Sequence, residues 1–76
     1  MVKPGDRKAL KKFGSHLNRL RRARNLSLRE LSYACNIDNS KISKIEKGQV
    51  NITFTTLLQL AEALEMSLSE LMTFDQ

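Results

Sequence analysis

The segment NIDNSKISKIEKG, residues 36–48, decides how the rest of the sequence is interpreted. Ile42 and Ile45 are three positions apart, which places both side chains on one face of a helix. The other face carries small polar side chains and a cation, namely Asn39, Ser40, Ser43 and Lys44. Amides and hydroxyls are mediocre helix formers, and a solvated helix more often carries Glu and Lys. The composition therefore favours a face that recognises a ligand, and a merely solvated face is the alternative.

Charge is distributed unevenly along the 76 residues, which suffice for one domain with a small apolar core. Residues 1–47 hold all 13 Lys and Arg and four acids, a net charge of +9, whereas residues 48–76 hold four acids and no Lys or Arg, a net charge of −4. Clustered basic residues favour a polyanionic partner. Double-stranded DNA is the first candidate, and an anionic membrane surface is the second.

The chain contains one histidine, His16, and one cysteine, Cys35. A metal site needs three or four ligands and a catalytic nucleophile needs an activating base, so we expect no metal, no cofactor and no enzymatic activity. A lone cysteine forms no intramolecular disulfide. The sequence also lacks a signal-peptide core and any stretch of eighteen or more apolar residues, so we expect a soluble cytoplasmic protein without a membrane span.

Apolar residues that recur every three or four positions predict an all-α chain of five short helices. We expect residues 1–8 to form a flexible basic leader and residues 9–76 to form a single domain. The first helix is predicted over residues 9–24, followed by Asn25 in the left-handed conformation. In the predicted fourth helix, the buried stripe is expected to contain Phe54, Leu57, Ala61 and Leu64, with Leu58 and Leu60 at its flanks.

Capping residues place the starts of the later helices. Ser27 and Glu30 fit a capping box, so the second helix is predicted to begin at Leu28 and to run to Cys35. Asn36 suits a turn with positive φ, and Asp38 can cap a third helix that ends at Lys47 and Gly48. Thr53 is a plausible cap for the fourth helix, and a second capping box at residues 67–70 begins the fifth.

The second and third helices are each about two turns long, and a connection of three or four residues forces them to cross sharply, as in a helix-turn-helix. The stretch around this corner, LRRARNLSLRELSYACNIDNSKISKIEKGQVNITFTTLLQLAEALEMSLSEL, resembles the XRE-type, phage-repressor-like helix-turn-helix family. The resemblance extends over about residues 13–72. It implies a compact five-helix, lambda-repressor-like domain that binds DNA sequence-specifically, as small transcriptional regulators and restriction-modification controller proteins do.

The resemblance also implies roles for individual residues. The outward face of the third helix would enter the major groove, with base contacts from Asn39, Ser40 and Lys44, since Asn pairs with adenine and Lys donates to guanine. The expected phosphate contacts are Arg29, Lys41, Ser43, Lys47, Asn51, Arg19 and Arg22. Arg21 and Glu46 are expected to form a structural ion pair between the first and third helices.

One small module buries too little surface for tight specific binding, so we expect a homodimer that reads a palindrome. The candidates for the dimer interface are the spare apolar residues of the segment without cations: Val50, Leu58, Leu60, Leu68, Met72 and Phe74. An antitoxin-like module that sequesters a partner protein, such as a toxin, is the alternative function. Membrane binding is disfavoured, because the first helix has no apolar face to spare from the core.

Overall fold

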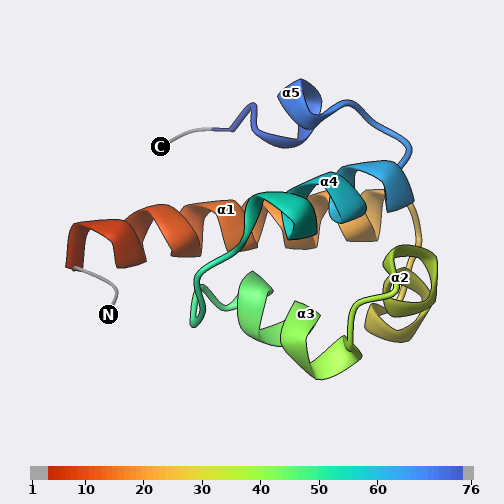
Figure 1. The fold of residues 1–76 in the computed structure, drawn as a ribbon, viewed down its shortest axis with the longest axis horizontal. Helices are drawn as coiled ribbons and strands as arrows, with labels where there is room; N and C mark the ends of the chain where they lie inside the picture. The colour runs from red at the N-terminus through yellow and green to blue at the C-terminus, as the bar shows by residue number, and fades with distance from the viewer. Residues whose placement is uncertain (1–3, 75–76) are drawn as a thin grey trace.

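The computed structural model describes residues 4–74, which form five α-helices and no strand. Figure 1 shows the helices in chain order. Their bounds are α1 Pro4–Ala23, α2 Leu28–Cys35, α3 Asn39–Glu46, α4 Phe54–Ala63 and α5 Leu68–Leu71. The predicted all-α fold with five helices is therefore confirmed.

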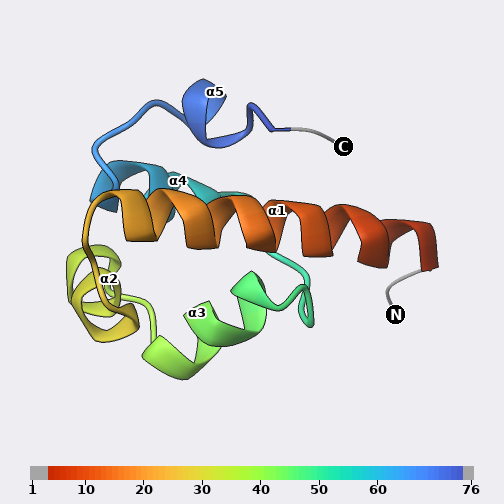
Figure 2. The same cartoon turned by 180° about the vertical axis from the view of Figure 1, so that it is seen from behind.

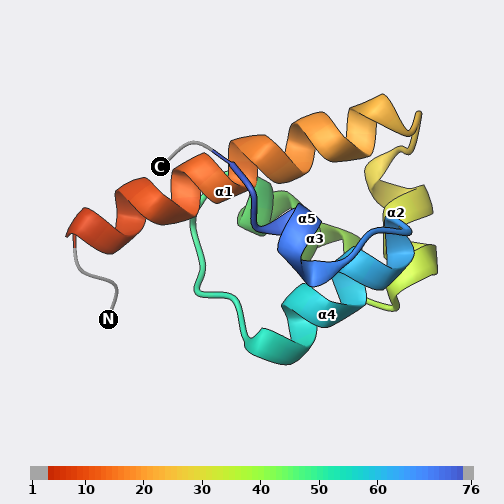
Figure 3. The same cartoon turned by 90° about the horizontal axis from the view of Figure 1, so that it is seen from above.

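The helices are arranged in three levels (Figures 1 and 2). α1 and α4 occupy the middle, α2 and α3 lie on one side of them, and α5 lies on the other side. Seen from above, α1 and α4 diverge from the end where α1 meets α2, with α5 over the space between them and α3 beneath it (Figure 3). α3 and α5 therefore face opposite sides of the molecule.

The core is formed by apolar side chains from all five helices and from the turn between α2 and α3. Its buried members are Phe13, Leu17, Leu31, Cys35, Ile37, Ile42, Ile45, Leu60, Ala61, Leu64 and Leu71. The two positions predicted to share one face of the third helix, Ile42 and Ile45, are both among them. The hydrophobic effect that accompanies burial of this apolar surface is the main source of stability in so small a domain.

Local capping signals determine where most helices begin and end. The Ser27 and Ser67 side chains accept hydrogen bonds from the amides of Glu30 and Glu70. The carboxylates of the two glutamates accept hydrogen bonds from the two serine amides, so both capping boxes are confirmed. These bonds lower the pKa of both carboxyl groups from the usual 4.5. Asn25 and Asn36 adopt the left-handed conformation, with φ of 56° and 58°, as the sequence predicts.

α1 begins at Pro4 rather than at Ala9, so residues 4–8 are helical and the flexible leader predicted for residues 1–8 is wrong over that part. Residues 1–3 of the leader lie outside the described chain. Proline is tolerated in a first helical turn, because the N–H groups there have no carbonyl partner within the helix. Asp6 complements the positive end of the helix dipole. Apolar periodicity misses this extension because its residues are mostly polar.

The buried stripe of α4 also differs from the prediction. Phe54 is 62% exposed, whereas Leu60, which was expected at the flank, is fully buried. Phe54 is the first residue of α4, and the first turn of this helix projects away from α1, as Figure 3 shows. Thr56 is buried instead, and its hydroxyl lies 2.9 Å from that of the capping Thr53.

In the part of the chain that the structure describes, no helix combines the length and the apolar character needed to span a membrane.

Candidate nucleic-acid interface

α2 and α3 form the predicted corner, joined by only three residues, Asn36 to Asp38. Asn36 reverses the chain with a positive φ, and Ile37 then enters the core at 8% exposure. The Asp38 carboxylate accepts the Ser40 amide at 3.1 Å and caps α3. A buried residue between a left-handed turn and a helix cap leaves the corner little freedom, so the direction of α3 is determined by the packing beneath it.

The face of α3 opposite Ile42 and Ile45 is open to solvent. Asn39, Ser40, Lys41, Lys44 and Lys47 are exposed, and Ser43 is partly buried. Ser40 and Lys44 are one turn apart, as are Lys44 and Lys47, so these side chains lie on the same side of the helix. The structure therefore gathers the predicted base-contacting residues on an accessible surface.

Ser40 is already engaged by the cap of its own helix. Its hydroxyl donates a hydrogen bond to the Asp38 carboxylate, which also accepts one from the Ser40 amide. These two bonds, together with the nearby Lys44 charge, lower the pKa of Asp38 below its usual 3.8. The Ser40 oxygen can still accept a hydrogen bond, but its proton is committed to Asp38. Sequence reasoning assigned the two residues separate roles and missed the pair.

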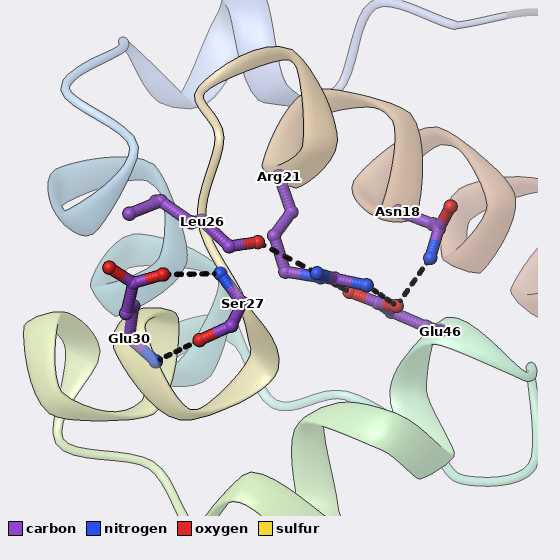
Figure 4. A network of polar contacts seen from close by, with 6 residues as sticks. All are labelled: Asn18, Arg21, Leu26, Ser27, Glu30 and Glu46. Atoms are coloured by element: carbon purple, nitrogen blue, oxygen red, sulfur yellow. Dashed lines mark hydrogen bonds and ion pairs between the residues drawn. The ribbon is translucent and has the colours of Figure 1, made fainter.

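The end of α3 is tied to α1 by the predicted ion pair (Figure 4). Arg21 Nε donates to Glu46 Oε2 at 2.7 Å, and the Arg21 guanidinium donates again to Oε1 at 3.1 Å. The two side chains are only 10% and 7% exposed. The bond to Glu46 raises the pKa of Arg21 above its usual value. The ion pair expected between the first and third helices is thus present in the structure.

Two further groups complete this network. Asn18 Nδ2 donates to Glu46 Oε1 at 2.7 Å, and the Arg21 guanidinium also donates to the Leu26 carbonyl at 2.7 Å (Figure 4). Arg21 thus connects the end of α1, the turn between α1 and α2, and the end of α3. Sequence reasoning missed Asn18, although its position three residues before Arg21 on the same helix face could have indicated it.

Arg29 is exposed in the first turn of α2, beside the Ser27–Glu30 capping box. The Glu30 carboxylate accepts the Ser27 amide at 2.9 Å, so a negative group already occupies this helix end (Figure 4). An incoming anion would therefore contact the Arg29 side chain, because the Ser27 and Glu30 amides are already hydrogen-bonded within the capping box. Asn51, the expected contact in the loop after α3, is exposed as well.

Arg19 and Arg22 lie apart from the other expected phosphate contacts. Both are exposed and share a stripe of α1 with Lys12 and Ser15, at steps of three and four residues. The stripe of α1 that faces α3 contains Asn18 and Arg21 instead. The structure thus groups Arg29 and the cations of α3 around the helix-turn-helix, and places Arg19 and Arg22 on a separate side of α1.

The expected interface candidates are only partly accessible. Leu60 is fully buried in the core, so its assignment to a dimer interface is wrong. Leu58 and Met72 are 42% and 39% exposed. Val50, Leu68 and Phe74 are partly buried, and the Phe74 ring packs edge-to-face on Phe13 with 5.7 Å between centroids. Sequence reasoning missed Phe54, one turn before Leu58, because it placed this residue in the core.

His16 and Cys35 contribute to packing. The His16 ring stacks on Phe74 with 5.1 Å between centroids, and the Cys35 thiol is buried, which raises its pKa. Within residues 4–74, no group of three or more His, Cys, Asp or Glu side chains is positioned to hold a metal ion.

The model of the helix-turn-helix family matches residues 17–71, from the middle of α1 to the end of α5. The chain belongs to the XRE-type helix-turn-helix family. The matched region contains the α2–α3 corner and both partners of the Arg21–Glu46 pair. The family fold is the DNA-binding fold of transcriptional regulators.

Three relatives place the family match in context. The uncharacterized HTH-type transcriptional regulator y4dJ of Sinorhizobium fredii (strain NBRC 101917 / NGR234) is 38% identical over 63 residues, which cover 83% of this chain and 82% of the relative. The restriction-modification controller protein C.AhdI from Aeromonas hydrophila has a similar structure, with a TM-score of 0.82, 38% identity, and coverage of 84% of this chain and 97% of that one. An HTH_3 family transcriptional regulator from Vibrio cholerae has a TM-score of 0.82 and 29% identity over 87% of this chain and 37% of that one.

Proposed function

We propose that this helix-turn-helix protein is a transcriptional regulator that inserts α3 into the major groove of a palindromic operator as a homodimer. The observation that carries the proposal is the exposed face of α3, where Asn39 and Lys44 are accessible on a helix whose other face is locked into the core. Asn and Lys are suited to adenine and guanine edges, respectively. Because its hydroxyl proton is held by Asp38, Ser40 would contact bases as an acceptor.

Contacts to the DNA phosphate backbone would come from the cations around α3, the reading helix of this proposal. Arg29 at the start of α2 and Lys41 and Lys47 on α3 are exposed, whereas the exposed Arg19 and Arg22 lie on a side of α1 away from α3. Ser43 and Asn51 would add neutral hydrogen bonds. Such contacts position a protein on the duplex without reading its sequence. Their number sets the salt dependence of binding.

Dimerisation is supported by the separation of the two surfaces. α5 lies on the side of the molecule opposite α3, and the segment that contains α4 and α5 has no Lys or Arg (Figure 1). Phe54 and Leu58 expose an apolar stripe on α4, and Met72 exposes another apolar group after α5. A second copy could cover these groups while leaving α3 free for DNA.

Selection of bound sequences from random duplex DNA tests the proposal. We expect a palindromic consensus whose binding weakens steeply with salt concentration. Absence of any enriched sequence would contradict it and favour a module that binds a partner protein.

Two substitutions separate base reading from backbone contact. Lys44→Ala is expected to relax the preference at one base pair of each half-site, a discrimination of about 1–3 kcal/mol, because it removes a donor to a base edge. Arg29→Ala is expected to weaken binding to all duplexes about equally, because phosphates carry no sequence information. Competition binding with duplexes altered at single positions measures both effects. Equal losses on every duplex for the two variants would show that the roles are wrongly assigned.

A further inference from the structure

An open groove of about 700 Å³ lies between the first half of α1 and the turn that follows α3. Its lining includes four cationic residues, Arg7, Lys8, Lys11 and Lys47, together with Leu10, Gly48 and Gln49. We propose that this groove binds backbone phosphates of the DNA strand that borders the major groove occupied by α3. This inference rests on the proposed function and adds a phosphate-binding surface to it.

The groove continues the contact between α1 and α3. The stripe of α1 that faces α3 runs through Arg7, Lys11, Gly14, Asn18 and Arg21 at steps of three or four residues. Asn18 and Arg21 bind Glu46, and the backbone of Gly14 lies against the last carbonyls of α3. Lys11 packs directly on Gly48, since a Cβ on that glycine would lie 2.7 Å from the Lys11 Cα. Arg7 is the next position of the stripe.

The first turns of α1 extend past α3 and past the turn that follows it (Figures 1 and 3). Arg7 lines the groove together with Lys47, Gly48 and Gln49, which directly follow α3. This part of α1 precedes residue 17, where the family match begins. The cations of α1 in the groove are thus a feature of this chain outside the matched region.

Within residues 4–74, the charges in the groove have no ion-pair partner. All four cationic side chains are exposed, and in residues 4–74 the one ion pair is that of Arg21 and Glu46. Two acids are direct neighbours of these cations in sequence. Glu46 is paired with Arg21, and Asp6 lines a different and more apolar depression beside Phe13 and Phe74. Four like charges at close range repel one another, and an anion in the groove would relieve this repulsion.

The position of Lys47 favours a nucleic-acid strand as the source of that anion. Lys47 directly follows Glu46, the last residue of α3, so the groove opens where the reading helix ends. If α3 lies in the major groove, the strand that borders this groove passes beside its last turn. An open surface with cations from both α1 and the residue after α3 suits a run of phosphates better than one small ion.

The test compares wild-type protein with Arg7→Gln/Lys11→Gln on the duplex obtained by selection, over a series of NaCl concentrations. Glutamine keeps a helix-forming side chain and removes only the charge. We expect the slope of log K against log salt to become shallower by about one to two per protomer. Affinity near physiological salt should fall roughly two- to tenfold, with the base preference unchanged.

The matched control is Lys12→Gln/Arg24→Gln, which also removes two exposed positive charges from the α1 region without altering the groove. It should keep the wild-type slope. If wild-type protein binds and both variants share its slope, the groove proposal is overturned while the proposed function stands. If wild-type protein enriches no duplex, the proposed function itself fails, and this inference fails with it. Thermal denaturation verifies folding, and single Arg7→Gln replaces the double variant if that variant unfolds.

Titration with inorganic pyrophosphate distinguishes a free anion from a DNA strand. The Gly48 amide resonance reports on the groove directly. A pyrophosphate-induced shift that Arg7→Gln/Lys11→Gln abolishes, together with unchanged DNA binding by that variant, would identify a site for small anions and overturn the strand proposal.

Discussion

At the scale of single residues, Glu46 has the most demanding environment. It accepts hydrogen bonds from Asn18 and twice from Arg21, and its side chain is 7% exposed. Burying a carboxylate is tolerable only when charge and hydrogen bonds compensate for lost hydration. The pair therefore stabilises the joint between α1 and α3 only as long as both partners are present.

We predict that Glu46→Gln lowers the free energy of unfolding by about 3 kcal/mol, because it leaves the Arg21 charge nearly buried and without a counterion. The double variant Arg21→Met/Glu46→Leu should lose less stability than the sum of the losses in Arg21→Met and Glu46→Leu, since neither charge remains without its partner. Urea denaturation measures these free energies. Glu62→Gln, at an exposed position of α4, is the control and should change little. Additive losses in the double variant would show that the pair is not coupled.

At the scale of elements, the packing of α1 on α3 depends on the absence of a side chain at Gly14. A Cβ there would meet the carbonyl oxygens of Ile45 and Glu46, which are backbone atoms and cannot rotate away. Helix propensity alone would favour alanine at this position by about 1 kcal/mol. The close approach of the two helices therefore outweighs a local preference.

Gly14→Ala is accordingly predicted to destabilise the protein by about 1–3 kcal/mol, because α1 and α3 must move apart. Ser15→Ala, at the neighbouring exposed position of α1, tests propensity without the contact and should stabilise by a few tenths of a kcal/mol. Thermal denaturation compares the two variants. If Gly14→Ala stabilises as Ser15→Ala does, the close packing of α1 on α3 is not a constraint.

At the scale of the whole molecule, cations and exposed apolar groups are separated. The cations of α3 lie on the side of the molecule away from α5, whereas Phe54, Leu58 and Met72 belong to the segment without Lys or Arg. This separation allows one copy to use both surfaces at once. It also links self-association to affinity for a palindromic duplex, since a palindrome is bound tightly only if two copies stay together.

Leu58→Glu is predicted to weaken self-association at least about tenfold, because it places a carboxylate in an apolar contact. The fold should survive, since Leu58 is 42% exposed in the single chain. Sedimentation equilibrium measures the change, and Gln59→Glu, which adds the same charge at the next exposed position of α4, should leave it unaltered. Wild-type protein that stays monomeric, or Leu58→Glu that associates as tightly, would exclude this surface as the dimer interface.

The sequence by itself determined the features that depend on residues within four positions of one another. The two capping boxes, the left-handed Asn25 and Asn36, and the inward face of α3 all follow from such short spacings. The accessible polar face of α3 follows as well, because burying Ile42 and Ile45 turns Asn39 and Lys44 outward. Local hydrogen bonds and helix periodicity act in the same way whatever surrounds them.

Only the tertiary structure decided which parts of distant segments meet. It buried Leu60 and exposed Phe54, joined Asn18 to Glu46, and brought Lys11 against Gly48. It also extended α1 over residues whose apolar pattern is weak. Each of these outcomes depends on where one helix lies relative to another. Helix positions result from the packing of the whole core, and local spacings in the sequence do not predict that packing.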